Sequence, residues 1–280
     1  MNRIKKIRRA LKMELREHES SFRVYTVLRF LMIANMIFQF YRGNYESGFV
    51  CILTLILLIM PSLIQVSLRI EFPTVLEIII LLFIFAAEIL GETHEFYIIF
   101  PHWDTLLHTL NGFLMAAIGL SLVNLLNKSD KMTFSLSPLF TAIVAFCFSM
   151  TIGVLWEMFE FAMDQFFLLD MQKDTIVHQI STVMLDPTGG NARVLLKEIG
   201  NVSINGDELG LGGYLDIGLI DTMHDLIVNF IGAVIFAIIG YFYTKNKNEN
   251  SVIKRLVPRK KNKDRDFLSQ IKESHQSMGK

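Results

Sequence analysis

The chain contains six long stretches of apolar residues, separated by shorter polar segments. Each stretch is long enough to cross about 30 Å of hydrocarbon as a helix that rises about 1.5 Å per residue. Inside lipid the backbone groups must satisfy one another's hydrogen bonds, so helices are the expected form. The sequence therefore predicts an all-α fold, a polytopic transmembrane helical bundle of about six helices, at 24–41, 49–68, 73–91, 102–126, 135–163 and 218–243.

Lysine and arginine are distributed unevenly around these stretches. Residues 1–23 carry eight of them and residues 244–280 carry eleven. In a six-helix arrangement, 22 of the 27 basic residues lie on the side of the two termini, including Arg69, Lys128 and Lys131 in short links. The basic side of a membrane protein is normally cytoplasmic. We expect a multi-pass protein of a bacterial inner membrane with both termini in the cytoplasm.

This pattern divides the chain into three parts. A basic N-terminal segment at 1–23 precedes a transmembrane domain at 24–243, and a basic tail follows at 244–280. Within the domain, the link at 165–217 is expected to lie outside the cytoplasm. Its segment 191–203 suits either a small hairpin or an interfacial helix. A link of this length is either a functional lid or a disordered segment.

The basic ends allow two interpretations. Ile4, Ile7, Leu11 and Leu15 recur at helical spacing between cations, which is typical of an amphipathic helix lying on the anionic lipids of the inner leaflet. Alternatively, both ends are solvated signals that set the orientation of the protein. The net charge is zero, with 27 basic and 27 acidic residues, so the overall charge indicates no nucleic-acid partner.

Acidic and histidine residues gather at one end of the last four helices. An ionisable group at the centre of a membrane costs about 2.5–3.5 kcal/mol, so such groups tend to face protein and carry function. Here they lie where the third and fifth helices end and where the fourth and sixth begin, which places all of them in the outer leaflet. Within each helix, spacings of three, four or seven residues put them on one face. The predicted pocket contains Glu88, Glu92, Asp104, His108, Asn111, Glu157, Glu160, Asp164, Asp221, His224, Asp225 and Asn229.

So many carboxylates repel one another unless a cation balances them, and no lysine or arginine lies on these faces. We therefore expect a divalent metal ion. Carboxylates with histidine suit Mn, Fe or Zn, and carboxylates alone suit Mg. By analogy with di-metal helical bundles, the expected ligands are Glu88, Asp104, His108, Glu157, Glu160, Asp221 and His224.

The same residues also have a structural interpretation. Asp104 and Asp221 lie in first turns, where an acid caps a helix or complements its dipole. Glu92 lies near the membrane surface, where water satisfies it at little cost. His94 and Glu77 are expected to be solvated or locally satisfied.

Four short strings carry a resemblance to a known family: GETHEFY at 91–97, PHWDTLLH at 101–108, WEMFE at 156–160 and DTMHD at 221–225. The resemblance spans roughly residues 85–240, and within this range the segment 171–213 is extended relative to the family's pattern. The last string, with Asn229 and Gly232 after it, is also similar to VanZ-like proteins, which points to the cell envelope. Through these four strings the chain resembles the YjdF family of bacterial inner-membrane proteins. The resemblance implies a membrane location without an established chemistry.

Three functions remain open. The first is a metal-assisted hydrolase or transferase that acts on a membrane lipid or lipid-linked envelope substrate, with Asp225 or Glu92 as general base. The second is a non-catalytic envelope scaffold in which the acids form contacts that hold the helices together. The third is a cation or proton transporter, although only Arg29 and Glu77 continue the polar path toward the cytoplasm. The sequence contains neither the His-Glu-x-x-His motif of zinc proteases nor a Walker-type phosphate loop.

Overall fold

The computed structural model of the chain describes residues 3–127, 136–246 and 252–277, so Lys128 and Lys131 lie outside the described residues. The described residues include six helical segments long and apolar enough to cross a membrane, which confirms the predicted all-α bundle. The spans are α2 (Glu19–Tyr41), α3 (Tyr45–Leu57) continued by α4 (Met60–Leu68), α5 (Thr74–Phe85) continued by the π-helix η1 (Ala86–Thr93), α7 (Trp103–Asn127), α8 (Pro138–Phe167) and α9 (Leu219–Asn246).

The chain forms two compact units. The first unit comprises Met1–Thr151 and Val228–Lys280, and the second comprises Ile152–Ile227. The helices α8 and α9 are each continuous across the boundary between the units.

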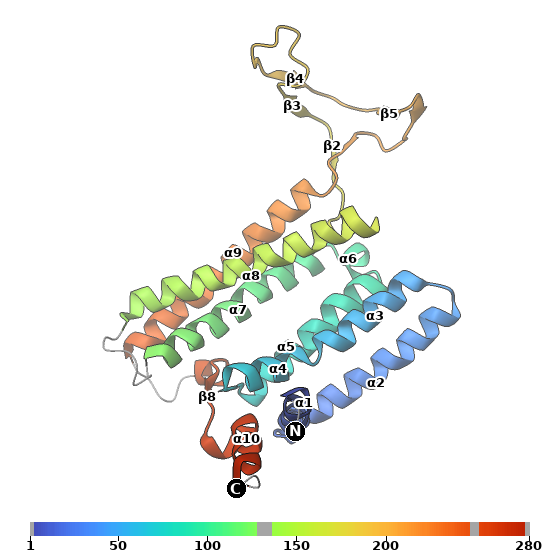
Figure 1. Ribbon diagram of the computed structural model, residues 1–280. Helices are drawn as coiled ribbons and strands as arrows, with labels where there is room; N and C mark the ends of the chain where they lie inside the picture. The colour runs from blue at the N-terminus through green and yellow to red at the C-terminus, as the bar shows by residue number, and fades with distance from the viewer. Residues whose placement is uncertain (1–2, 128–135, 247–251, 278–280) are drawn as a thin grey trace. The chain divides into compact units, whose positions relative to one another are not determined.

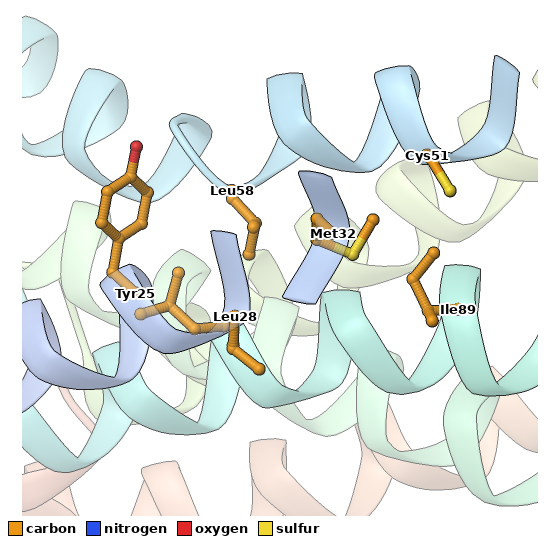
Figure 2. Close-up of a cluster of buried hydrophobic side chains, with 7 residues drawn as sticks. Tyr25, Leu28, Met32, Cys51, Leu58 and Ile89 are labelled. Atoms are coloured by element: carbon orange, nitrogen blue, oxygen red, sulfur yellow. The ribbon is translucent and has the colours of Figure 1, made fainter. Parts of the chain in front are cut away.

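The first helices of the first unit pack around a buried apolar cluster. Tyr25, Leu28 and Met32 recur at helical spacing, so they lie on one face of α2. Figure 2 shows this face directed toward Cys51 and Leu58 on the second span and Ile89 on η1. Other apolar side chains of α2 point away from the unit and remain exposed, as expected for a lipid-facing surface.

Two glycines allow α7 and α9 to touch through their backbones. A Cβ at Gly112 of α7 would lie 2.1 Å from the carbonyl oxygen of Asn229, and one at Gly232 of α9 would lie 1.9 Å from that of Thr109. Neither position accommodates a side chain without moving a helix. Small residues at helix crossings permit such close packing in membrane proteins.

The two ends of the chain fold against each other in the first unit (Figure 1). Helix α1 (Arg3–Glu14) contacts α10 (Phe267–Ser277), and Ala10 packs with Val66 and Ile271. The short strands β1 (Ile70–Glu71) and β8 (Arg259–Lys260) pair antiparallel beside them. The turns η2 (Val252–Arg255) and η3 (Lys263–Arg265) connect these pieces. We call α1, β1 and residues 252–277 the terminal cap.

The second unit contains the long link as three antiparallel strand pairs. Strand β2 (Ile176–Val177) pairs with β7 (Tyr214–Leu215), and β3 (Ile180–Thr182) pairs with β4 (Val194–Leu196). The third pair joins β5 (Ser203–Ile204) to β6 (Asp207–Glu208). The segment 191–203 contains β4 and the first residue of β5, joined by residues without regular secondary structure, and it contains no helix.

Candidate functional site

The predicted site residues fall into two sets, one in each unit. In the first unit, α7 carries Asp104 and His108, and η1 carries Glu88 and Glu92. The second unit holds the other residues predicted as ligand or general base, which are Glu157, Glu160, Asp221, His224 and Asp225.

Glu88 lies on η1, and its side chain is only 3% exposed. Among the residues that the structure describes, its Oε2 atom has no hydrogen-bond partner. A buried polar atom without a partner is costly, so this oxygen favours a proton, a water molecule or a cation beside it. The π-helix itself was not predicted from the sequence, and such helices often occur at functional sites. Glu92, near the end of the same π-helix, is half-buried.

A cluster of aromatic residues holds η1 against the start of α7. The indole Nε1 of Trp103 donates a hydrogen bond to the carbonyl oxygen of Ala86, 3.3 Å away. Between these elements, the short helix α6 (Phe96–Ile99) places the Tyr97 ring where a Cβ at Gly91 would be only 2.3 Å from it. Trp103 thus fixes the first turn of α7 next to η1, and the following residue is Asp104.

Asp104 and His108 lie one turn apart on α7, and their side chains meet. The Nε2 atom of His108 is 3.4 Å from Oδ1 of Asp104. His108 is buried and Asp104 is half-buried. Two ligand atoms about 2.1 Å from one tetrahedrally coordinated ion lie about 3.4 Å apart, so the pair fits a shared metal ion. The same distance also fits an ion pair with a protonated histidine.

The next turn of α7 is bound to α9. The side-chain Nδ2 of Asn111 donates a hydrogen bond to Oδ1 of Asn229, 3.0 Å away, and Asn229 is fully buried. Both residues are in the first unit. Asp225 lies one turn before Asn229 on the same continuous helix and is also buried.

In the second unit, His224 and Asp225 are neighbours in sequence with different environments. The His224 side chain is 53% exposed and its Nδ1 lies 3.7 Å from Oδ1 of Asp225, whose side chain is 2% exposed. Because successive residues of a helix point about 100° apart, His224 is directed away from the buried face that holds Asp225.

Two other predicted ligands make hydrogen bonds that give them structural roles. Oε1 of Glu160 accepts a hydrogen bond from the indole Nε1 of Trp156, one turn earlier on α8, at 2.8 Å. Oδ2 of Asp221 accepts one from the backbone N–H of Lys173 in the long link, also at 2.8 Å. Glu157 lies between Trp156 and Glu160 in sequence and is buried.

Neither the Trp156–Glu160 bond nor the Trp103–Ala86 bond was predicted from the sequence. The first has a local signal, because residues 156 and 160 are one helical turn apart. The second joins two different helical segments and has no local signal.

Comparison with known proteins identifies the family of the chain. A family described as predicted membrane protein (DUF2238) matches residues 24–246. The chain belongs to the DUF2238 family. The DUF2238 match includes α2 from residue 24 onward, the other five spans, both sets of site residues and the three strand pairs of the second unit, whereas α1 and residues 252–277 lie outside it. No curated protein and no solved structure matches the chain.

Proposed function

We propose that this DUF2238 chain is a metal-dependent hydrolase or transferase that acts on a membrane lipid or a lipid-linked envelope substrate. Asp104 and His108 would hold the metal ion. The main support is the 3.4 Å separation between a carboxylate oxygen and an imidazole nitrogen at Asp104 and His108. Carboxylates together with imidazole suit Zn, Mn or Fe.

The hydrogen bond between Asn111 and Asn229 supports this site from within the first unit. It holds the turn of α7 that follows His108 against α9. Residues three or four positions apart share a helix face, so His108 and Asn111 lie on the same face of α7.

The remaining acids have roles around the ion in this proposal. Glu92 is half-buried and serves as the general base, as the sequence predicts for Glu92 or Asp225. Glu88 brings a buried oxygen without a hydrogen-bond partner among the described residues, and either a proton or the ion would satisfy it. A metal at such a site supplies polarisation of a phosphoryl or carbonyl oxygen, or activation of water.

The membrane orientation is part of the same proposal. The basic residues concentrate toward the two termini, which supports cytoplasmic ends in a bacterial inner membrane and a site in the outer leaflet. The resemblance to the YjdF family, and more distantly to VanZ-like proteins, supports a substrate of the cell envelope by analogy.

Metal content is the first test. The wild-type protein, Asp104→Asn and His108→Ala are purified in detergent, and bound metals are counted by inductively coupled plasma mass spectrometry. We expect about one ion per chain in the wild type and its loss in both variants, because each variant lacks one metal ligand. His102→Ala is the matched control, because His102 is exposed and two residues before Asp104.

Activity is the second test. The wild-type protein is incubated with liposomes of bacterial polar lipids, with and without a chelator, and water-soluble products are identified by mass spectrometry. A chelator-sensitive product that is absent for Glu92→Gln, with metal still bound, supports the proposed base. A protein that binds no metal and variants that only melt earlier would contradict the enzyme.

A non-catalytic scaffold is the second candidate. The hydrogen bonds of Glu160 to Trp156 and of Asp221 to Lys173 favour it, because both acids bind protein groups. A scaffold predicts that Asp104→Asn lowers the melting temperature while the purified wild type contains no metal. Ion flux into proteoliposomes is the result that would instead support a transporter.

A further inference from the structure

The terminal cap contains an open hollow with a cavity volume of about 570 Å³. It lies between α1 and the start of α10, within the first unit. The residues that line it are Arg9, Lys12, Met13, Arg16, Glu17 and Phe267.

The charge of this hollow is positive. Its acid, Glu17, is bound to Arg265, whose Nε lies 3.2 Å from a Glu17 carboxylate oxygen. In the described part of the chain, Arg9, Lys12 and Arg16 form no ion pair with any acid. Three cations without an acidic partner therefore surround one opening.

The hollow also has apolar walls and lies at the start of a membrane span. Met13 is exposed, and Lys261 lies over the Phe267 ring with its Nζ 5.1 Å from the ring centre. The guanidinium of Arg16 lies 5.8 Å from the centre of the Phe22 ring, which belongs to the first turn of α2. The hollow thus begins where the span Glu19–Tyr41 begins.

We propose that this hollow binds the phosphate of an anionic phospholipid. Arginine and lysine bind phosphate oxygens strongly, and a cation near an anionic membrane surface contributes to lipid binding. Met13 and Phe267 contact the apolar part of the same lipid. The position at the start of α2 favours a membrane lipid over a free phosphate ion, although the cations recognise the same group in both. This site is separate from the proposed metal site and uses none of its residues.

The test is a titration of the full-length protein in detergent with phosphatidylglycerol, counting bound lipid by native mass spectrometry. Phosphatidylcholine and inorganic phosphate form the parallel arms. We expect phosphatidylglycerol to bind more tightly than phosphatidylcholine. Arg9→Gln combined with Lys12→Gln should weaken phosphatidylglycerol binding about 30-fold, from the typical contribution of two cations near a membrane surface.

The matched control is Lys5→Gln with Arg8→Gln, which removes the same charge from the same helix outside the lining residues. We expect this control to weaken binding by less than about 5-fold, because its charges act only at a distance. Arg9→Lys with Lys12→Arg should retain binding. Hydrogen exchange of residues 267–277 checks that α10 remains folded in each variant.

The titrations with the two lipids and with phosphate, together with the variants, distinguish the possible outcomes. Loss in the hollow variant alone, with α10 folded, supports the lipid site. Equal loss in both pairs of variants, or equal binding of the two lipids, overturns it. Inorganic phosphate that binds in the same residue-dependent way while phosphatidylglycerol does not overturns the lipid as occupant and assigns the hollow to a free phosphate.

Discussion

Lys261, in the segment after the last span, donates a hydrogen bond to Glu14 at the end of α1. Both side chains are 2% exposed, so the two ends of the chain are joined by a buried ion pair. Glu14 also lies one turn after Ala10, which packs against Ile271 of α10. The apolar and the charged contacts therefore both hold α1 against residues 252–277.

Removal of one member of this pair should open the terminal cap. A buried charge without its partner typically costs about 3–5 kcal/mol, so Lys261→Met at pH 8 should destabilise the packing of α10 by about that amount. Adding Glu14→Leu should restore most of the loss, because two apolar side chains replace two charges. Hydrogen exchange of residues 267–277 measures the change. Lys272→Met, an exposed lysine on α10, is the control and should have little effect.

The terminal cap should also weaken as pH rises. Burial raises the pKa of Glu14 from 4.5 to about 7, against the hydrogen bond and the positive charge of Lys261, which lower it. The folded cap then binds a proton that the unfolded cap releases between these two values. Its stability is therefore greatest below pH 4.5 and falls as pH rises to about 7, by roughly 3 kcal/mol.

This pH dependence has a direct control. The opening free energy of residues 267–277 is measured by hydrogen exchange at pH 5 and pH 8, after correction for intrinsic exchange rates. Glu14→Gln carries no titrating group and should remove most of the difference. A variant that keeps the full pH dependence of the wild type would refute the assignment to Glu14.

The six spans were predictable because length and hydropathy act locally. The predicted stretch 102–126 differs by one residue at each end from α7, and 73–91 nearly coincides with α5 and η1. The terminal cap could not be predicted in the same way. Its basic composition is also typical of a solvated end, and its contacts join residues more than 240 positions apart, as in the Glu14–Lys261 pair.

The candidate site was predictable to a similar extent. Asp104 and His108 were expected to share a helix face, and the structure places them in contact, because the contact lies within one helical turn. The hydrogen bond from the Lys173 backbone to Asp221 depends on the path of the long link, which has no periodic signal. The π-helical turn at Glu88 likewise cannot be predicted from the hydropathy of the sequence.

The glycine crossing of α7 and α9 should not tolerate alanine. In Gly112→Ala the new Cβ would lie 2.1 Å from a backbone oxygen of Asn229, so the helices must separate. Overpacking of this kind typically costs about 1–3 kcal/mol, which should lower the melting temperature by roughly 5 °C. Gly240→Ala is the control, because the atoms nearest its Cβ would be side-chain atoms of Leu120 at 3.1 Å rather than backbone atoms. Equal melting of the two variants would show that the helices are not in backbone contact.

The hydrogen bond between Asn111 and Asn229 should support metal binding. Asn111→Leu removes the donor and leaves the buried Asn229 side chain without it, so the turn of α7 that follows His108 loses its contact with α9. Loss of a supporting contact of this kind typically weakens metal affinity about 10- to 100-fold. Competition with a chelating dye measures that affinity. The double variant Asn111→Leu with Asn229→Leu should recover stability without recovering metal affinity, whereas unchanged affinity in both variants would separate this bond from the metal site.

Asp216 should anchor the long link where it returns to α9. Its Oδ1 atom accepts hydrogen bonds from the backbone N–H groups of Thr175 and Gly218, and Oδ2 accepts one from Ile220. Burial raises the pKa of Asp216, but these hydrogen bonds outweigh it and hold the pKa below its ordinary value.

Asp216→Ala should therefore destabilise the β2–β7 pair by about 1–2 kcal/mol, the usual cost of losing such a cap. Hydrogen exchange of the amides at 175–177 and 214–216 measures the change, which should be small for Asp207→Ala, because Asp207 is exposed in β6. The lowered pKa implies stability that is present above the unfolded value of about 3.8 and is lost as pH falls below it. Unchanged exchange in Asp216→Ala would mean that the strand pair holds without this carboxylate.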